Sequence, residues 1–220
     1  MLAIIATVLF AGYFWSPWAI SAFLSCIGAF VVYELIHNAA KVDNIAIVTV
    51  ACLYSAVTIL LSQGGLEFLF VPSILYNIAS IALIILFHKE LDIGKIAFVY
   101  GIPILFTVSL CMLNALINNS NGFYYLVLLF GFSSVCDIGA YFTGVTIGKH
   151  KLCPEISPKK TVEGAIGGIA FSLIFILATM FLFGNFNIAI LLLTIPLCIL
   201  GIMGDLFASV IKRSVGIKDF

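Results

Sequence analysis

Long apolar runs separated by short polar breaks fill this sequence, and they constrain its fold more than any other feature. Hydrophobic residues make up 63% of the 220 residues, and charged residues make up 9%. An ordinary soluble domain is about one quarter charged, so this chain has too few charges to cover itself with a solvated surface. Runs of roughly 20 apolar residues span a bilayer as helices. We therefore expect an all-α, polytopic helical integral membrane protein.

The polar breaks divide the chain into about eight apolar segments, each interpreted as one transmembrane helix. The segments are Leu2–Phe14, Pro17–Ile36, Asn44–Leu61, Leu66–Phe87, Ile96–Ile117, Phe123–Val145, Ala165–Phe183 and Phe186–Met203. The first is short, which indicates a thin or tilted helix or a missing start. We expect a single membrane domain over residues 1–220, in which residues 1–121 are mainly scaffold and residues 122–220 carry the site.

The positive charges predict the orientation. If each segment spans once, the loops at 37–43, 88–95 and 146–164 and the stretch after Met203 lie on the same side. Those regions contain all ten basic residues, and the opposite turns contain none. The positive-inside rule places the lysine-bearing side in the cytoplasm, so we expect a bacterial inner-membrane protein with its active site facing the cytoplasm. The zero formal net charge says nothing about nucleic acid, and because the chain has no basic tail no nucleic-acid partner is expected.

The charges also gather toward the end of the chain, where the first notable feature is Asp137 in "SSVCDIGAYFTG". An ionisable group inside an apolar segment is costly and usually marks a functional site that faces a wet cavity. The alternative is a carboxylate paired with a lysine of the next loop, which would only hold two helices together. Gly139 and Gly144 would let another helix or a ligand approach closely.

The second feature is the stretch "CPEISPKKTVEGAIGG", from Cys153 to Gly168. Pro154 and Pro158 interrupt helical continuity. Thr161 is a candidate N-cap for the following helix, whose backbone N–H groups would then point toward a bound anion. Four lysines form a positive surface beside it: Lys149, Lys151, Lys159 and Lys160. This combination suits phosphate. A loop that binds only anionic lipid headgroups is the alternative.

The third feature is the end of the chain, "GDLFASVIKRSVGIKDF". On a helix, Asp205, Ser209, Lys212 and Arg213 share one face. A carboxylate one turn from a hydroxyl and followed by two cations can hold a metal ion and phosphate oxygens together. Basic residues that merely end a membrane helix would explain Lys212 and Arg213, but they would not explain Asp205.

These motifs closely resemble those of the phosphatidate cytidylyltransferases (CDP-diacylglycerol synthases). The resemblance rests on "DIGAYFTG", on "ISPKKTVEGAIGG" and on the Ser209–Asp219 block "SVIKRSVGIKD", and it covers the last third of the chain in detail. It implies that CTP and phosphatidate give CDP-diacylglycerol and pyrophosphate among the membrane lipids, with Mg²⁺ as cofactor. The catalytic residues implied by this resemblance are Asp137, Lys160, Asp205, Lys212 and Arg213. It implies as substrate-binding residues Ser157, Lys159, Lys160, Thr161, Ser209, Lys218 and Asp219. Asp205 is the expected metal ligand, with Asp137 as a second candidate.

The family signature continues beyond the Lys218–Asp219 pair into a histidine–glycine segment and an Asp-Arg-x-Asp motif. The 220 residues stop at Phe220. We therefore expect a truncated chain with little or no activity, in which the carboxylates that would complete the metal site with Asp205 are missing.

Three alternatives to this enzyme are open. An ion-coupled transporter would use Asp137 to bind its coupling ion. Another CTP-using lipid kinase or transferase would share the same phosphate chemistry, and an inactive remnant would still insert and dimerise. The oligomeric state is open as well, a homodimer included. We expect the six scattered cysteines to be small buried core residues, and the three histidines to lie at the membrane interface.

Overall fold

The computed structural model describes residues 16–214, so the expected first span, Leu2–Phe14, lies outside the described residues. Within the described part, seven helices are long and apolar enough to cross a membrane. They correspond one to one with the remaining seven predicted segments, so the expectation of a polytopic helical membrane protein is confirmed. The chain divides into two compact units, residues 1–123 and 124–220.

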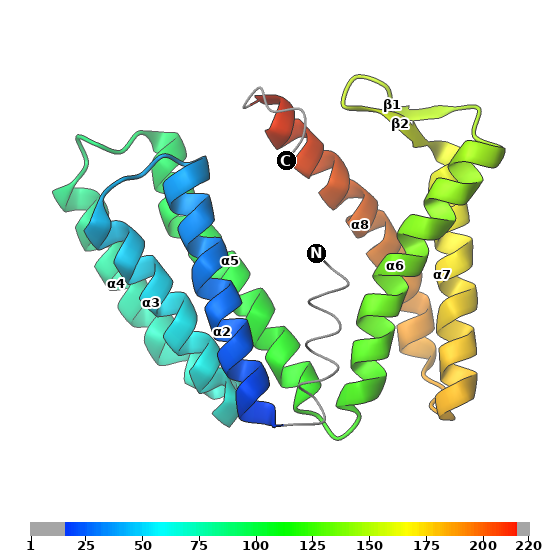
Figure 1. Cartoon of the computed structure of the whole chain (residues 1–220), viewed down its shortest axis with the longest axis horizontal. Coiled ribbons are helices and arrows are strands. Elements are labelled where there is room, and N and C mark those ends of the chain that lie inside the picture. The colour runs from blue at the N-terminus through cyan, green and yellow to red at the C-terminus, as the bar shows by residue number, and fades with distance from the viewer. Residues whose placement is uncertain (1–15, 215–220) are drawn as a thin grey trace. The chain divides into compact units, whose positions relative to one another are not determined.

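The described part of the first unit is a bundle of four long helices (Figure 1). Its described elements are α2 (Pro17–Tyr33), the π-helical turn η1 (Glu34–Ala39), α3 (Ile45–Leu61), the 3₁₀ turns η2 (Ser62–Gly64) and η3 (Leu66–Leu69), α4 (Phe70–Leu86) and α5 (Ile93–Ile117). Two of these helices begin at side-chain caps. Asn44 Oδ1 accepts a hydrogen bond from Ala46 N at 3.2 Å, and Asp92 Oδ1 accepts one from Lys95 N at 2.8 Å.

The second unit contains three long helices and a β-hairpin (Figure 1). Its elements are α6 (Gly122–Thr146), β1 (Lys151–Cys153), β2 (Ser157–Thr161), α7 (Val162–Phe183) and α8 (Ile188–Ser214). At the far end from the hairpin, α7 stops at Gly184, whose φ of 64° is a left-handed conformation that glycine adopts readily. The last helix continues well beyond the predicted end at Met203. This extension carries Asp205 on regular helix.

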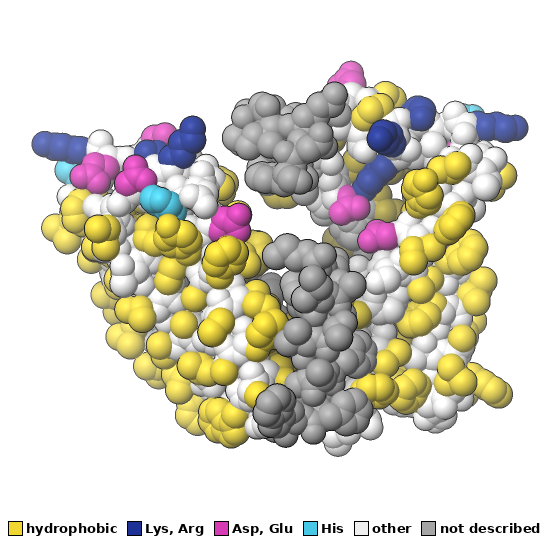
Figure 2. Space-filling model, viewed as in Figure 1, with side chains coloured by type: hydrophobic (Ala, Val, Ile, Leu, Met, Phe, Trp, Pro, Cys, Tyr) yellow, Lys and Arg dark blue, Asp and Glu magenta, His cyan; other side chains and the backbone are white. Residues whose placement is uncertain are grey.

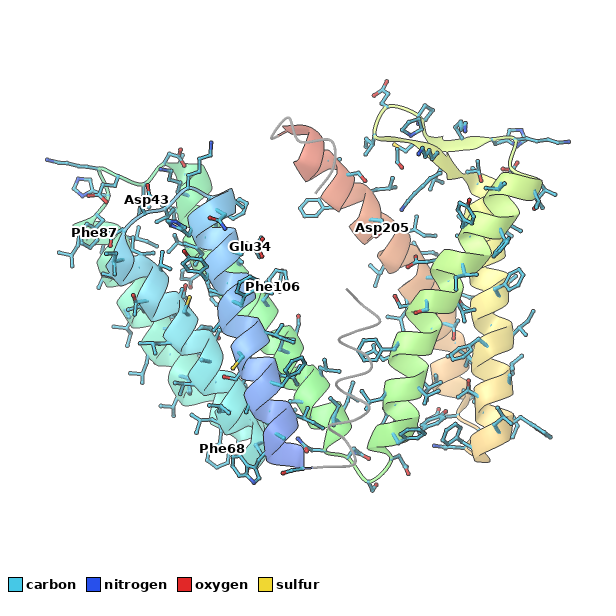
Figure 3. All side chains as sticks on the ribbon, viewed as in Figure 1. Glu34, Asp43, Phe68, Phe87, Phe106 and Asp205 are labelled. Carbon is cyan, nitrogen blue, oxygen red and sulfur yellow. The ribbon has the colours of Figure 1, made fainter. Side chains whose placement is uncertain are left out.

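Charged side chains gather at one end of each unit, above flanks that are largely hydrophobic (Figure 2). In the first unit, Glu34 and Asp43 lie at that end, and Phe68 lies at the other (Figure 3). The opposite end is held together by uncharged polar groups instead. The fully buried Asn114 accepts from the Ser21 hydroxyl at 3.0 Å and donates to Ser62 Oγ at 2.9 Å. These bonds satisfy buried polar groups where α2, α3 and α5 meet.

A proline inside α5 leaves one backbone carbonyl of that helix without its usual donor, and a tyrosine of α4 replaces it. Pro103 has no N–H group, so the Val99 carbonyl, one turn earlier, lacks its usual helical donor. The buried Tyr76 hydroxyl donates to that carbonyl oxygen at 2.5 Å. In a bilayer an unpaired carbonyl is costly because no water is present to replace the donor. Tyr76 therefore lets α5 keep a proline within its span.

We expect Tyr76→Phe to destabilise the protein by about 1–3 kcal/mol, because it leaves the buried Val99 carbonyl without a donor. The measurement is thermal unfolding in detergent. The same change in a Pro103→Ala background should cost little, since residue 103 then supplies an N–H group to Val99. An equal cost in both backgrounds would show that the tyrosine stabilises the fold in some other way.

The predicted burial of the cysteines is confirmed only in part, and the predicted position of the histidines at the membrane interface stays a prediction. All six cysteines are free thiols, but only Cys111 and Cys198 are buried, so the prediction that the cysteines are core residues is wrong for the other four. Cys26 is exposed on α2, where a small apolar side chain can face lipid as readily as it can pack in a core. Two histidines pair with acids: His37 of η1 with Asp43 at 3.4 Å, and His150, just before β1, with Glu163 at 2.6 Å.

Candidate active site

A cavity of about 600 Å³ lies within the second unit, lined by α6, the hairpin, the start of α7 and α8. Part of its lining is apolar, including Phe132, Leu152 and Leu197. Its polar and charged lining residues are Ser133, Asp137, Tyr141, Lys151, Lys159, Lys160, Thr161 and Asp205. Three cations, two carboxylates and three hydroxyl groups therefore share one concave space.

Helix α6 supplies one of the two carboxylates of the cavity, that of Asp137. Ser133, Asp137 and Tyr141 are spaced four residues apart, which places them on one face of the helix. Asp137 is exposed rather than enclosed in the packing. Among the described residues it forms no ion pair, so its carboxylate does not hold two helices together through a lysine of the hairpin. The cavity-facing interpretation of Asp137 is the one that the geometry supports.

Helices α6 and α7 approach each other closely through small residues. A Cβ atom on Gly139 would lie 2.7 Å from Phe171 Cβ, and one on Gly168 would lie 2.9 Å from the Cys136 carbonyl oxygen. Near the cavity, a Cβ atom on Gly164 would lie 3.3 Å from Gly144 Cα. The close approach expected at Gly139 and Gly144 is therefore confirmed. It sets the start of α7 directly against the face of α6 that carries Asp137.

The stretch between α6 and α7 forms a hairpin, where the sequence predicted only an irregular positive loop. Its strands pair antiparallel, with Lys151 opposite Thr161 and Cys153 opposite Ser157, and the register shifts between these pairs. Pro158 is tolerated because each strand of a two-stranded ribbon has an unpaired edge. Because the two strands lie side by side, Lys151 on β1 lines the same cavity as Lys159 and Lys160 on β2.

An ion pair joins the hairpin to α8 across the cavity. Lys160 Nζ lies 2.9 Å from Asp205 Oδ2. The lysine side chain is 30% exposed and the aspartate side chain 62% exposed, so both stay accessible from the cavity. Figure 3 shows Asp205 on α8. A pair this open gains little net stability from its attraction. Each member is therefore free to exchange its partner for a ligand of the appropriate charge.

The predicted N-cap of α7 is confirmed. Thr161 has extended backbone angles, and its Oγ1 accepts a hydrogen bond from Gly164 N at 3.1 Å. Thr161 and Gly164 both line the cavity. The positive end of the α7 dipole therefore lies at the same place as the three lysines, an arrangement that favours a bound anion.

The other predicted site residues lie outside the cavity lining or outside the described part. Ser157 lies on β2, away from the lining, and the Ser209 hydroxyl donates to the Asp205 carbonyl oxygen at 2.8 Å. Lys212 and Arg213 lie on α8, but their side chains are not described. Lys218 and Asp219 fall beyond residue 214. Their assigned roles stay predictions.

Two cavity residues were missed by sequence reasoning, and Lys151 was assigned only to a general positive surface. Ser133 and Tyr141 could have been found by their spacing from Asp137, since residues four apart on a helix share its face. Lys151 could not have been placed in the same way, because its position depends on strand pairing with Thr161.

The carboxylates of the cavity could supply only part of the coordination of a magnesium ion. The described residues contain no group of three or more His, Cys, Asp or Glu side chains that could hold a metal on their own. Mg²⁺ is usually bound by one or two carboxylates, with substrate phosphates and water completing its coordination. Asp137 and Asp205 line the same cavity as three lysines that could bind phosphate. The two carboxylates therefore fit a magnesium ion that is bound together with a phosphate ligand.

The fold and the cavity define an integral membrane protein with lysines and carboxylates gathered at one end of its helices. The whole chain, residues 1–220, matches the model of the Cytidylyltransferase family, and the protein belongs to that family. Over 103 residues it is 48% identical to the phosphatidate cytidylyltransferase of Staphylococcus saprophyticus, which covers 46% of this chain and 39% of that protein. Over 133 residues it is 38% identical to the phosphatidate cytidylyltransferase of Aquifex aeolicus, which covers 57% of this chain and 46% of that protein. The chain thus aligns with less than half of each relative's length.

Proposed function

We propose that this protein transfers a cytidylyl group from CTP to phosphatidate, giving CDP-diacylglycerol and pyrophosphate. Its membership of the Cytidylyltransferase family and the names of its relatives support this reaction. The structural observation that carries the proposal is the cavity itself. Lys151, Lys159 and Lys160 and the N-terminus of α7 meet two carboxylates there, at the charged end of a membrane-spanning unit.

In this reaction a phosphate oxygen of phosphatidate attacks the α-phosphorus of CTP, and the bond from that phosphorus to the bridging oxygen of the β-phosphate breaks. The pyrophosphate leaves with the electron pair of that bond. Such a transfer needs positioning and charge neutralisation rather than a covalent protein intermediate. The hairpin lysines bind the nucleotide phosphates, and the backbone N–H groups at the start of α7 add fixed partial positive charge.

Asp137 and Asp205 would hold a magnesium ion together with the nucleotide phosphates, which is the usual composition of such a site. When bound, the ion supplies positive charge that offsets the charge developing on pyrophosphate. Because Lys160 and Asp205 lie side by side as an ion pair, the two residues can act on the same bound nucleotide. Lys160 would be free to bind phosphate, and Asp205 would be free to hold the ion, once the nucleotide is bound.

The lipid substrate enters from the membrane, and its headgroup reaches the cavity at the charged end. The apolar part of the lining, which includes Phe132 and Leu197, suits the glycerol and upper acyl region of phosphatidate. If each segment spans the membrane once, the regions of the sequence that contain the basic residues lie on the side that the positive-inside rule assigns to the cytoplasm. We place the protein in a bacterial inner membrane with the cavity open to cytoplasmic CTP.

One experiment tests both the reaction and its side. Inside-out and right-side-out vesicles are prepared from cells that overproduce the full-length protein, and vesicles from cells with an empty vector give the background. Labelled CTP, which is too highly charged to cross the bilayer, is added outside with Mg²⁺ and phosphatidate. We expect CDP-diacylglycerol above background only in inside-out vesicles. No product in either preparation would refute the reaction, and product only in right-side-out vesicles would reverse the orientation.

A further inference from the structure

The hairpin that carries the three cavity lysines is too small to be rigid by itself. Its strands contain three and five residues, and the pairing between them is irregular. An isolated two-stranded ribbon is at best marginally stable in water. Lysine side chains are flexible as well, so a mobile hairpin would add a large ordering cost to phosphate binding. A contact outside the cavity would lower this cost by holding the hairpin in place while the lysines bind phosphate.

Glu163 makes that connection at the base of the hairpin. Its carboxylate oxygens accept from the His150 backbone N–H at 3.1 and 3.2 Å, and Oε1 lies 2.6 Å from His150 Nδ1. The neighbouring Val162 N–H donates to the His150 carbonyl oxygen at 2.9 Å. His150 directly precedes β1, and Glu163 is the second residue of α7. The contacts therefore fix the start of the hairpin to the helix that follows it.

The environment of Glu163 suits anchoring rather than ligand binding. Its side chain is 22% exposed, whereas that of His150 is 79% exposed. Both residues lie outside the cavity lining, so the carboxylate does not face the proposed nucleotide. A carboxylate in the first turn of a helix is stabilised by the helix dipole, and its hydrogen bond to a backbone N–H is charge-assisted. These effects favour a persistent contact.

We propose that Glu163 is a positioning residue that acts through His150 to hold the hairpin, and with it Lys151, Lys159 and Lys160, against the cavity. This inference rests on the proposed function, because it assigns the lysines to the phosphates of CTP. The proposal assigns different roles to the two glutamates between Cys153 and Gly168. Glu163 anchors the hairpin, and Glu155 is exposed at its turn.

The kinetic test uses Glu163→Ala in the full-length protein, with Glu155→Ala as a control of the same residue type on the same hairpin. We expect the KM for CTP to rise about tenfold in the Glu163 variant while kcat falls less, because the lysines must be ordered on binding. Glu163→Gln should recover part of the loss, since its amide oxygen can still accept from the His150 N–H. Lower kcat at unchanged KM would indicate a general loss of folded enzyme and would refute the positioning role.

A second measurement does not depend on turnover. Hydrogen exchange of the amides in residues 150–161 should become faster in Glu163→Ala and stay unchanged in Glu155→Ala. CTP binding to both variants is measured by calorimetry. Faster exchange with weaker CTP binding supports the proposal even if no product forms, in which case only the proposed reaction fails. Unchanged exchange, or faster exchange with unchanged CTP affinity, overturns the proposal whether or not the wild-type protein is active.

Discussion

Lys160→Ala should lower kcat/KM for CTP about a hundredfold while leaving membrane insertion intact. Removing one fixed positive partner of a phosphate typically costs two orders of magnitude in rate. Lys160 lines the cavity and lies 2.9 Å from Asp205, so its loss also removes the cation that pairs with Asp205. The cavity would then carry two lysines against two carboxylates, so incoming phosphates would meet no net positive charge. The measurement is the rate of CDP-diacylglycerol formation over a range of CTP concentrations with purified full-length protein.

The matched control is Lys149→Ala, which removes an exposed lysine just before the hairpin that does not line the cavity. We expect its kinetics to be close to those of the wild-type protein. The double variant Lys160→Ala/Asp205→Ala distinguishes phosphate binding from a purely structural ion pair. If the pair only held β2 to α8, each single change would already break the contact, and the double variant would lose no more activity than Lys160→Ala alone. A larger loss in the double variant shows that the two residues have separate roles. An unchanged rate for Lys160→Ala across the CTP range would exclude this lysine from phosphate binding.

The positions of the helices along the chain were predictable because the bilayer allows few other structures for an apolar segment. An apolar run of sufficient length must form a helix there, and each predicted segment in the described part does. The ends were less predictable. Helix α8 continues past Met203 because its residues near Asp205 can remain helical while their polar groups are solvated. The hydrogen bond from Tyr76 to the Val99 carbonyl could not be predicted, since it depends on which helix packs beside Pro103.

The candidate site was predictable in outline. Topology alone places Asp137, Lys160 and Asp205 toward one membrane face, and the structure brings all three to one cavity. The pairing within the cavity was not predictable. Sequence reasoning weighed a lysine partner for Asp137, whereas Lys160 pairs with Asp205. The turn geometry and strand register of the hairpin decide that choice, and the proline-interrupted sequence gives no periodic pattern from which to infer them. Among the described residues of the second unit, the charged side chains gather at one end (Figure 2), whereas a transporter would need ionisable groups spread along several helices.

Asp205→Asn should lower kcat/KM about a hundredfold and raise the Mg²⁺ concentration needed for half-maximal rate about tenfold or more. Asparagine keeps the size of the side chain and an oxygen that can accept from Lys160, but it removes the negative charge. Asp205 is 62% exposed on a regular stretch of α8, so the substitution should not disturb the packing. With Asp137 left as the other carboxylate of the cavity, the protein offers the ion one charged ligand instead of two.

The magnesium requirement is the decisive readout, because an aspartate that merely held Lys160 in place would change the rate without changing the dependence on Mg²⁺. Asp137→Asn should shift the magnesium titration in the same direction if both carboxylates hold the ion. Glu155→Gln, which removes an exposed carboxylate from the turn of the hairpin, should shift it little. Calorimetric titration of CTP with and without Mg²⁺ provides the same comparison in the absence of turnover. If Asp205→Asn binds CTP with the same magnesium dependence as the wild-type protein, Asp205 is not a metal ligand. Its place beside Lys160 would then serve only to orient the lysine.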